Sequence, residues 1–292
     1  KYGFNRTTMK TFVGDRLKGA LIGLLLMAPI LAFAMWLLET GGDRAWLMIW
    51  AGYTAFQFFL LWIAPIAILP LFLKLTPLPD GDLKTAIQAY VKKQTFKLDG
   101  VWVCDASKRS TKTNAFFTGY GKFRRLVLFD TMIAKIDAAE TTPERRRELI
   151  AEIVAITAHE AGHFRLGHIW KGMLVSTLVS AGVLFLAQRL LEAPELYLTF
   201  EIFPPNPAYG LPLAVLLLGK LGFFGSFAAN YFSRANEYAA DRFSVKTYGD
   251  REALIRGLRH LYRENLAILV QHPLFTALFA SHPPLLPRTD AI

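Results

Sequence analysis

The sequence has few cysteines, fewer acidic than basic residues and no apolar leader. Cys104 is the only cysteine among the 292 residues, so no disulfide can form within the chain and nothing in it requires an oxidising compartment. Asp and Glu number 23 against 33 Lys and Arg, which leaves a formal charge of +10. Residues 1–18 lack the apolar core of a signal peptide, and the first residue is Lys. We therefore expect the chain to be a fragment of a longer protein.

Apolar residues, in contrast, are abundant. They make up 53% of the chain, and the mean hydropathy of +0.31 is high for a soluble globular protein. A basic balance can indicate nucleic-acid binding, contact with anionic lipid, or the excess of cytoplasmic Lys and Arg in membrane proteins. Long apolar runs favour the last of these. The sequence therefore predicts an integral membrane protein embedded in the lipid bilayer, with no nucleic acid as partner.

Several runs are long enough to cross a bilayer core of roughly 30 Å. The four runs cover residues 19–38, 45–73, 172–188 and 211–232. Pro65 and Pro70 predict a kink or an early stop in the second run. Lys220 interrupts the fourth run, where we expect its ammonium group to face a protein interior or a water-filled cavity. The alternative, buried helices of a large soluble core, fits the first two runs poorly.

The distribution of Lys and Arg orients these spans. Basic residues precede the first run and follow the second, whereas the connection EAPELYLTFEIFPPNPAYG between the third and fourth has none. Positive charge favours the cytoplasmic side, so the N-terminus, residues 74–170 and the C-terminal tail are expected there. The predicted parts are residues 1–73, 74–170, 171–232 with an external loop near 190–210, and 233–292. Either the bacterial inner membrane or the eukaryotic endoplasmic reticulum membrane would suit this topology.

The region after the second run is expected to fold outside the bilayer. Residues 80–98 have the periodicity of an amphipathic helix, whose apolar side carries Leu83, Ile87, Tyr90 and Val91. Short strands are expected in GVWVCDAS, NAFFTGY and KFRRLVLFD, with turns at Gly119 and Gly121. This part of the chain therefore predicts a small β-sheet.

A long helix is predicted over residues 143–168. Thr142 is suited to cap its N-terminus, and Pro143 fits the first helical position. We expect this helix and the third span to form one nearly continuous element. After residue 233 the sequence predicts two helices separated near Gly249, followed by a proline-rich tail.

The predicted long helix carries the motif HEAGH. His159 and His163 are four residues apart and so share one helix face, where two imidazoles can bind a single zinc ion. Glu160 lies beside that face, where a carboxylate can act on a water molecule without binding the metal. The alternative is a pair of histidines on a helix surface, which a third ligand in the right place would disfavour.

The third metal ligand has to come from another part of the chain. A catalytic zinc usually has three protein ligands and one open position. His168 is the nearest candidate, but nine residues after His159 it would lie on the opposite face of the same helix. SRANEYAAD, residues 233–241, directly follows the fourth run and places Glu237 and Asp241 four residues apart. We predict that Glu237 is the ligand and that Asp241 orients a histidine N–H, although alone they could be two solvated acids.

With these motifs identified, the chain resembles the type I CAAX prenyl proteases, integral-membrane zinc endopeptidases of the gluzincin kind. The quoted segments that carry the resemblance are KYGFNRTT, RSTKTNAFFTGYGKFRRLVLFDTMI (109–133), HEAGH, SRANEYAAD and SHPPLLPR (281–288). It implies a mainly α multi-pass membrane protein whose gluzincin-like protease region includes a small β-sheet on the cytoplasmic side. It also implies hydrolysis of peptide or protein substrates that are prenylated or otherwise membrane-anchored.

The resemblance also implies roles for individual residues. One Zn2+ per chain would be bound by His159, His163 and Glu237. Glu160 would act as general base and acid, and His282 would donate to the tetrahedral oxyanion.

Further residues match the family in the substrate strand and around the metal. Asn114, Ala115 and Phe116 would lie in the strand that binds the substrate. Asp241 matches the motif aspartate beside the zinc ligands. Arg288 matches an arginine near the site, and the resemblance leaves its role open.

Other functions are compatible with parts of the pattern. HtpX-type proteases share the two metal motifs with fewer spans, and would degrade membrane proteins without using a prenyl group. The third hypothesis is a catalytically silent membrane scaffold, against which the intact HEAGH motif, Glu237 and His282 argue. The family has further spans upstream and usually continues beyond SHPPLLPR, which again leads us to expect a fragment.

Overall fold

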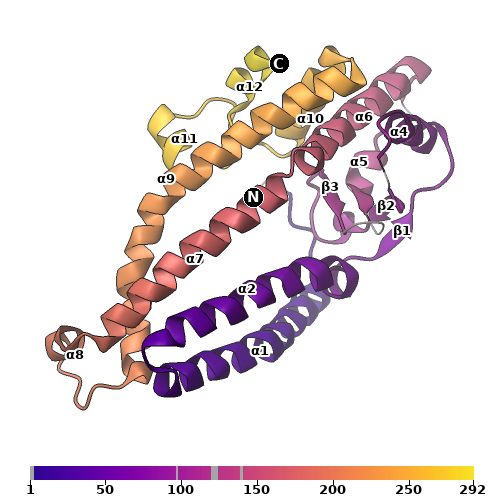
Figure 1. The fold of residues 1–292 in the computed structure, drawn as a ribbon. Helices are drawn as coiled ribbons and strands as arrows, with labels where there is room; N and C mark the ends of the chain where they lie inside the picture. The colour runs from indigo at the N-terminus through magenta and orange to yellow at the C-terminus, as the bar shows by residue number, and fades with distance from the viewer. Residues whose placement is uncertain (1–2, 97, 120–123, 139–140) are drawn as a thin grey trace. The chain divides into compact units, whose positions relative to one another are not determined.

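The computed structural model describes residues 3–96, 98–119, 124–138 and 141–292, which fall into two compact units (Figure 1). The first unit holds the chain up to Phe12 together with Trp62–Ile169 and Ala229–Ile292. The second unit holds Val13–Leu61 and Trp170–Ala228. The turn that we expected at Gly121 lies outside the described residues.

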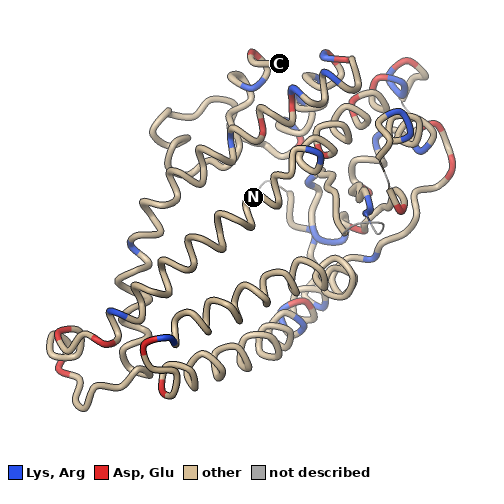
Figure 2. Tube along the Cα trace, in the orientation of Figure 1, with Lys and Arg blue, Asp and Glu red and all other residues tan. Residues whose placement is uncertain are grey.

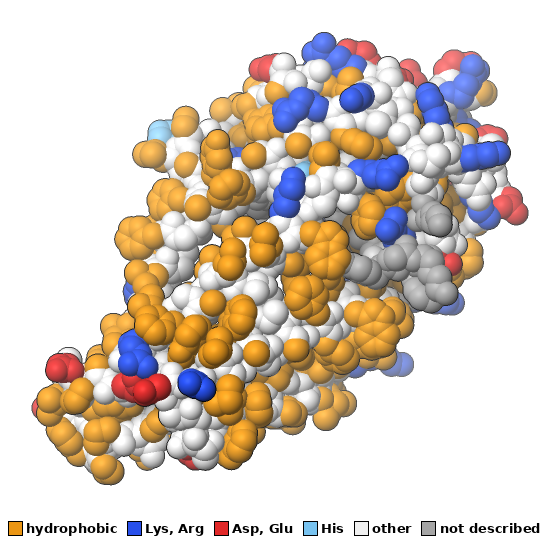
Figure 3. Space-filling view, in the orientation of Figure 1, with side chains coloured by type: hydrophobic (Ala, Val, Ile, Leu, Met, Phe, Trp, Pro, Cys, Tyr) orange, Lys and Arg blue, Asp and Glu red, His pale blue; other side chains and the backbone are white. Residues whose placement is uncertain are grey.

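Long apolar helices form the second unit. Its helices are α1 (Met9–Thr40), η1 (Gly42–Arg44), α2 (Ala45–Ile63), α7 (His168–Glu192), α8 (Pro194–Thr199) and the first part of α9 (Pro207–Tyr248). The described residues contain four helices long and apolar enough to cross a membrane, and in each one at most 11% of the apolar window is buried. Figure 2 shows few charges along α2 and α7, and Figure 3 shows apolar side chains gathered over these helices. Outward-facing apolar side chains suit a lipid solvent, so the predicted multi-pass, mainly helical fold is confirmed.

Polar groups join α2 and α7 within the second unit. The Gln188 side chain accepts a hydrogen bond from the Trp46 backbone N–H at 2.6 Å, and Trp50 Nε1 donates to the Thr177 carbonyl at 2.8 Å. Hydrogen bonds of this kind hold helices together in lipid, where apolar contact alone gives little preference between helices.

The predicted interruption of the second apolar run is confirmed. Helix α2 ends at Ile63, and a π-helical turn, η2 (Ala64–Ile68), connects it to the short helix α3 (Leu69–Phe72). Pro65 and Pro70 both lie in this stretch, and each lacks the N–H that a regular α-helix would use. Lys220 is exposed on α9, and the cavity expected beside it remains a prediction.

A four-stranded mixed sheet lies in the first unit, in the order β1-β2-β4-β3. Its strands are β1 (Leu75–Pro77), β2 (Gly100–Cys104), β3 (Ala115–Thr118) and β4 (Arg125–Phe129). Strand β4 runs parallel to β2, with Val101 opposite Leu126, and antiparallel to β3, with Ala115 opposite Leu128. The last three strands match the three expected from the sequence, whereas β1 was not predicted. Strand β3 lies at an edge of this sheet.

One face of the sheet packs against helices. Helix α4 (Asp82–Lys93) buries the four side chains that its periodicity predicted, Leu83, Ile87, Tyr90 and Val91. They join a core that includes Leu126, Leu128 and the inner face of α6 (Pro143–Arg165). The short helices η3 (Ala106–Lys108) and α5 (Asp130–Ile133) complete the connections.

Helix α6 starts as predicted and ends earlier than predicted. The Thr142 side chain accepts a hydrogen bond from the Arg145 N–H, and Pro143 occupies the first helical position. The helix ends at Arg165, because Gly167 adopts a φ of +67°, which breaks the right-handed helix. A helix over 143–168 that continues into the third span was therefore a wrong expectation: α7 is a separate helix that begins at His168.

The C-terminal part of the first unit is helical. Helix α9 ends at Tyr248, and Asp250 caps the next helix, α10 (Arg251–Glu264). Gly249 lies between them with a φ of +91°, so the break predicted near this glycine is confirmed. The tail then forms two short helices that were not predicted, α11 (Pro273–Phe279) and α12 (Leu285–Ala291). Helix α10 packs closely on α6 at Gly257, where an added Cβ would lie 3.3 Å from the Glu152 carbonyl oxygen.

Candidate metal centre

Helix α6 presents its two motif histidines to helix α9. Most of the second half of α6 is buried, including His159 at 6% exposed, whereas His163 is half-buried. Gly162 lies between them, and an added Cβ there would be 3.1 Å from Ala240 Cα. The absence of a side chain therefore lets the α9 backbone approach α6 closely. Ser244 of α9 fixes this contact by donating to the Ala155 carbonyl at 2.8 Å.

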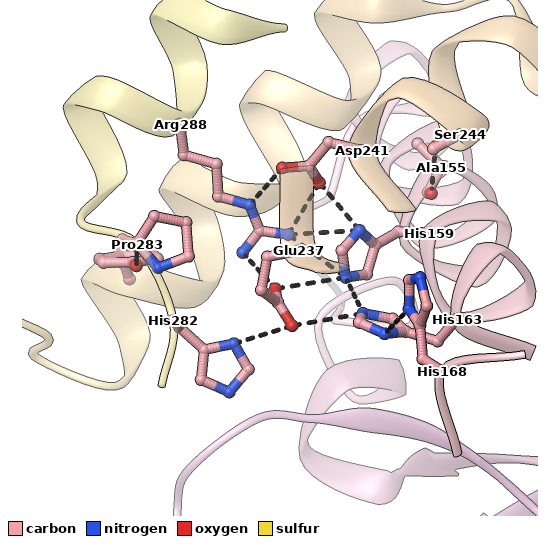
Figure 4. A network of polar contacts seen from close by, with 11 residues as sticks. Ala155, His159, His163, His168, Glu237, Asp241, Ser244, His282, Pro283 and Arg288 are labelled. Carbon is pink, nitrogen blue, oxygen red and sulfur yellow. Dashed lines mark hydrogen bonds and ion pairs between the residues drawn. The ribbon is translucent and has the colours of Figure 1, made fainter. Parts of the chain in front are cut away.

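Three potential ligands meet at this contact (Figure 4). His159, His163 and Glu237 each offer one ligand atom, and the three atoms lie within 4.8 Å of one another. The two Nε2 atoms are 3.1 Å apart, and the Glu237 carboxylate oxygens lie 3.6 Å from Nε2 of His159 and 3.3 Å from Nε2 of His163. Ligands bound to one tetrahedral zinc at about 2.0 Å are about 3.3 Å apart. The donor types and their spacing therefore fit a zinc ion.

The other nitrogen of each histidine ring is also engaged. Nδ1 of His159 lies 2.8 Å from the Asp241 carboxylate, and Nδ1 of His163 lies 2.9 Å from Nδ1 of His168. A fixed partner on the second nitrogen sets the tautomer and orientation of a metal-binding imidazole. Both Nε2 atoms are thereby left to face Glu237.

His168 is not where the sequence placed it. We expected it on the opposite face of α6, but α6 ends before it and the Gly167 turn brings its ring to His163. His168 is not one of the three grouped ligands, which agrees with the prediction that it does not bind the metal. The reason given for that prediction, a position on the opposite face of α6, was wrong.

Arg288 connects the two acids of α9. Its guanidinium donates to Asp241 through Nε at 2.6 Å and Nη2 at 2.8 Å, and Nη1 lies 3.2 Å from Glu237. All three residues are at most 5% exposed. A bidentate Arg–carboxylate pair fixes both groups in orientation, so Arg288 holds the carboxylates in place around the histidines.

Glu160 lies beside the ligands on the wall of a cavity of about 440 Å³. Polar groups of the cavity include Asn114, His282 and Arg288, and apolar walls come from Leu254, Leu258, Leu261, Ile268 and Phe279. Glu160 is not one of the three grouped ligands, and its role as general base stays a prediction. Burial raises the pKa of its carboxyl, which makes the carboxylate a stronger base.

His282 approaches the metal centre from the C-terminal tail. Its Nδ1 lies 3.1 Å from Glu237, and the side chain is 64% exposed, which leaves the rest of the ring open to the cavity. The hydrogen bond to Glu237 raises the pKa of the His282 ring. The ring is thus placed to donate a hydrogen bond into the cavity.

The predicted substrate strand reaches the same cavity through one residue. Asn114 is exposed and lines the cavity, directly before β3. Ala115 is buried in the core and Phe116 packs edge-on against Phe129, so neither side chain lines the cavity. Among the described strands only β4 pairs with β3, so β3 is an edge strand. Ala115 and Phe116 can therefore offer a ligand the N–H and C=O groups of their main chain.

Some residues that shape the site were missed. Tyr262 lines the cavity and donates to the Pro283 carbonyl at 2.8 Å, which fixes the tail next to His282. Asn265, at the end of α10, exchanges two hydrogen bonds with the backbone of Thr113. No local pattern marks such long-range contacts. Gly162 could have been noted, because a glycine inside a helix often marks a close approach.

Family models match both parts of the chain. The model described as Peptidase family M48 matches residues 77–292, and the model described as CAAX prenyl protease N-terminal, five membrane helices, matches residues 1–74. The two matches include the metal centre and the first two apolar helices.

Curated relatives are similar over the whole chain. The probable CAAX prenyl protease 1 of Schizosaccharomyces pombe is 37% identical over 100% of this chain, which covers 59% of that protein. The CAAX prenyl protease 1 homologues of Arabidopsis thaliana and Homo sapiens are 33% and 31% identical over 100% of this chain, which covers 66% and 67% of them. The chain thus spans roughly three fifths to two thirds of the length of these relatives.

A solved structure has the same fold. The crystal structure of S. mikatae Ste24p matches with a TM-score of 0.88 at 30% identity, covering 99% of this chain and 68% of that one. The chain therefore belongs to peptidase family M48, in the group of the CAAX prenyl proteases.

Proposed function

We propose that this chain forms the catalytic part of an integral-membrane zinc endopeptidase that cleaves prenylated or otherwise membrane-anchored peptides. The observation that carries the proposal is the meeting of His159, His163 and Glu237 on the wall of a cavity that also holds Glu160. The printed names of the relatives supply the substrate class, since they are called CAAX prenyl proteases.

In the proposed centre, His159, His163 and Glu237 hold the metal. Two imidazoles and one carboxylate with an open fourth position form the donor set of catalytic zinc sites. When bound, zinc supplies Lewis acidity towards a scissile carbonyl and acidifies a water molecule. Asp241 holds the imidazole of His159 through Nδ1 of that ring, and His168 holds the imidazole of His163 in the same way.

The remaining chemistry belongs to side chains of the cavity. Glu160 takes a proton from the attacking water at its carboxylate and delivers that proton to the leaving amine. His282 donates a hydrogen bond to the oxygen on which negative charge develops. Both residues line the same cavity, which supports this division of roles.

The substrate peptide is proposed to add to β3 as a further strand. Strand β3 leads away from Asn114 at the cavity, and one of its edges has no described strand partner. Main-chain hydrogen bonds along an edge strand hold a peptide irrespective of its side chains. The leucines of α10 on the cavity wall would then contact apolar side chains near the scissile bond.

We further propose that residues 74–170 and the C-terminal tail face the cytoplasm. The charge distribution supports this orientation, because basic residues are frequent in these segments and absent from residues 192–210. A catalytic unit on the side where prenylated proteins are present would suit the proposed substrates.

The test uses Glu160→Gln and a matched exposed acid on the same helix, Glu144→Gln. We expect Glu160→Gln to retain stoichiometric zinc while cleavage of a quenched farnesylated peptide falls by roughly 10²–10⁴-fold. Glu144 is exposed and near the start of α6, so its variant should keep both zinc and activity. Full activity of Glu160→Gln would refute the proposed mechanism.

The substrate class is tested separately. The same peptide is offered with and without its farnesyl chain to the protein in detergent micelles. A higher kcat/KM for the farnesylated peptide is expected, because burial of apolar surface adds binding energy. Equal values would argue against prenyl recognition and leave the peptidase mechanism intact.

A further inference from the structure

A second cavity lies in the first unit and shares no lining residue with the cavity at the metal centre. It measures about 210 Å³ and is lined by Arg145 and Glu152 of α6 and by Arg256, Arg259, His260 and Arg263 of α10. The metal-centre cavity, in contrast, is lined by Ile156, His159 and Glu160 further along α6. The proposed peptidase mechanism uses none of the residues of this basic cavity.

The sequence spacing directs the arginines of α10 to one face. Arg256, Arg259 and Arg263 are separated by three and four residues, so their side chains project on the same side of the helix. Helix α10 lies closely against α6 at Gly257, where Ile156 Cδ1 would be 3.2 Å from an added Cβ. Arg145 of α6 is thereby placed opposite the arginines of α10.

The cavity holds more positive than negative charge. Glu152, at 3% exposed, is the only acid of the lining, and it contacts Arg145 at 3.1 Å and His260 at 3.0 Å. Arg145 has a second partner in Glu148 at 2.8 Å. The lining therefore holds four guanidinium groups and one carboxylate, an excess of like charge that an anionic ligand would stabilise.

Hydrogen-bond donors remain available in the cavity. The side chains of Arg259 and Arg263 are exposed, and neither forms an ion pair or a hydrogen bond with a side chain of another described residue, although Glu264 is next to Arg263 in the chain. Nε of Arg256 is buried without a hydrogen-bond partner, and its nearest acid is Glu152 at 3.9 Å. A buried N–H donor that lacks an acceptor is unfavourable, so a ligand oxygen would stabilise it.

We propose that this basic cavity binds a phosphate group. The planar guanidinium fork matches the oxygens of phosphate in bidentate pairs, and a phosphomonoester has more negative charge to offset several arginines than a single carboxylate has. The ligand is then a phosphomonoester, carried either by an anionic phospholipid or by a soluble small molecule. This site does not depend on the peptidase function.

Binding is tested with one headgroup in two forms. Soluble glycerol 3-phosphate and dioctanoyl phosphatidic acid, which carries the same phosphomonoester on two acyl chains, are titrated into the protein in detergent micelles. Arg259→Gln/Arg263→Gln removes two of the four arginines that line the cavity and is expected to weaken binding at least about tenfold. The matched control is Arg147→Gln/Arg251→Gln, which removes the same charge from exposed positions of α6 and α10 that do not line the cavity.

The outcomes separate the sources of the phosphate. Tighter binding of the lipid than of glycerol 3-phosphate assigns the site to a phospholipid, and equal binding assigns it to a soluble phosphate compound; both support the proposal. Dioctanoyl phosphatidylcholine, which has no phosphomonoester, should not compete. The proposal is overturned if neither probe binds the unsubstituted protein, or if the control pair weakens binding as much as the test pair. Peptide cleavage is not a readout, so failure here leaves the proposed peptidase function untouched.

Discussion

Each histidine of the metal centre uses its two ring nitrogens for different partners. The Nε2 atoms face the carboxylate of Glu237, whereas Nδ1 of His159 meets Asp241 and Nδ1 of His163 meets His168. The two partners differ in charge, because Asp241 is an acid and His168 is an imidazole. The more exposed ligand, His163, is therefore oriented by the weaker acceptor.

Removal of His168 should loosen the metal centre without unfolding it. In His168→Ala the ring of His163 loses the contact at its Nδ1, so we expect zinc affinity to fall about 10–100-fold. His168→Asn, which can still accept a hydrogen bond, should recover part of the loss. Zinc affinity is measured by competition with a chelator, and His272→Ala, at an exposed histidine of the tail, is the control. Unchanged affinity in His168→Ala would show that this contact does not position His163.

Arg288 offsets the charge of two buried acids at once. Arg288→Met would leave Glu237 and Asp241 without their cation, and we expect the metal-free protein to lose about 3–5 kcal/mol in free energy of unfolding. The loss should be smaller with zinc bound, since the metal then compensates Glu237. Arg288→Lys should fall between, because an ammonium group cannot form the bidentate pair.

Thermal unfolding with and without zinc measures these differences. Arg251→Met, at an exposed arginine, should unfold as the unsubstituted protein does. A loss for Arg288→Met that is the same in both metal states would contradict the proposed compensation.

At the scale of elements, the contact between α6 and α9 determines whether the ligands meet. Gly162 permits this contact: a Cβ there would lie 3.1 Å from Ala240 Cα and 3.2 Å from both the Ala240 carbonyl oxygen and Phe243 Cβ. Two of these atoms belong to the backbone, which cannot move aside as a flexible side chain can. A side chain at this position would therefore displace α9 and with it Glu237.

Gly162→Ala should destabilise the first unit and weaken metal binding together. We expect a loss of about 1–3 kcal/mol in stability from the overpacked contact, together with lower zinc affinity. Gly172→Ala in α7 is the matched control, since nothing lies within 4 Å of a Cβ there. Stability and zinc affinity equal to those of the control would show that α9 adapts without moving Glu237.

Local sequence signals correctly predicted where α6 starts and which histidines share a face of it. They did not predict where α6 ends or where His168 lies. The cap at Thr142 and the four-residue spacing of His159 and His163 depend on neighbours in the chain, which the sequence displays. The position of His168 depended on the left-handed conformation of Gly167, which hydrophobic periodicity does not reveal. The burial of Arg288 depends on partners 47 residues away, so its role could not be read from the tail alone.

At the scale of the whole molecule, the proposed topology places α4 and α8 on opposite sides of the membrane. The chain is well suited to a labelling test, because Cys104 is 0% exposed and burial raises the pKa of its thiol to about 11. The native cysteine should therefore be inert towards a thiol reagent.

The test introduces one exposed cysteine at a time, as Lys92→Cys in α4 and Glu195→Cys in α8. In sealed vesicles with the cytoplasmic face outward, a membrane-impermeant maleimide should label Lys92→Cys and leave Glu195→Cys unlabelled until detergent is added. The unsubstituted chain serves as the blank. Labelling of both variants before detergent would refute the proposed orientation.

The edge position of β3 has a consequence for how a cleavage point would be chosen. A strand that offers only N–H and C=O groups cannot distinguish one side chain from the next. With the reactive groups fixed at one end of the strand, a peptide anchored elsewhere would be cut where its length from the anchor brings a bond to Glu160. The distance from the anchor, and not the local sequence, would then determine the cleavage position. One residue inserted between the anchor and the scissile bond should shift the cleavage position by one residue, whatever its side chain.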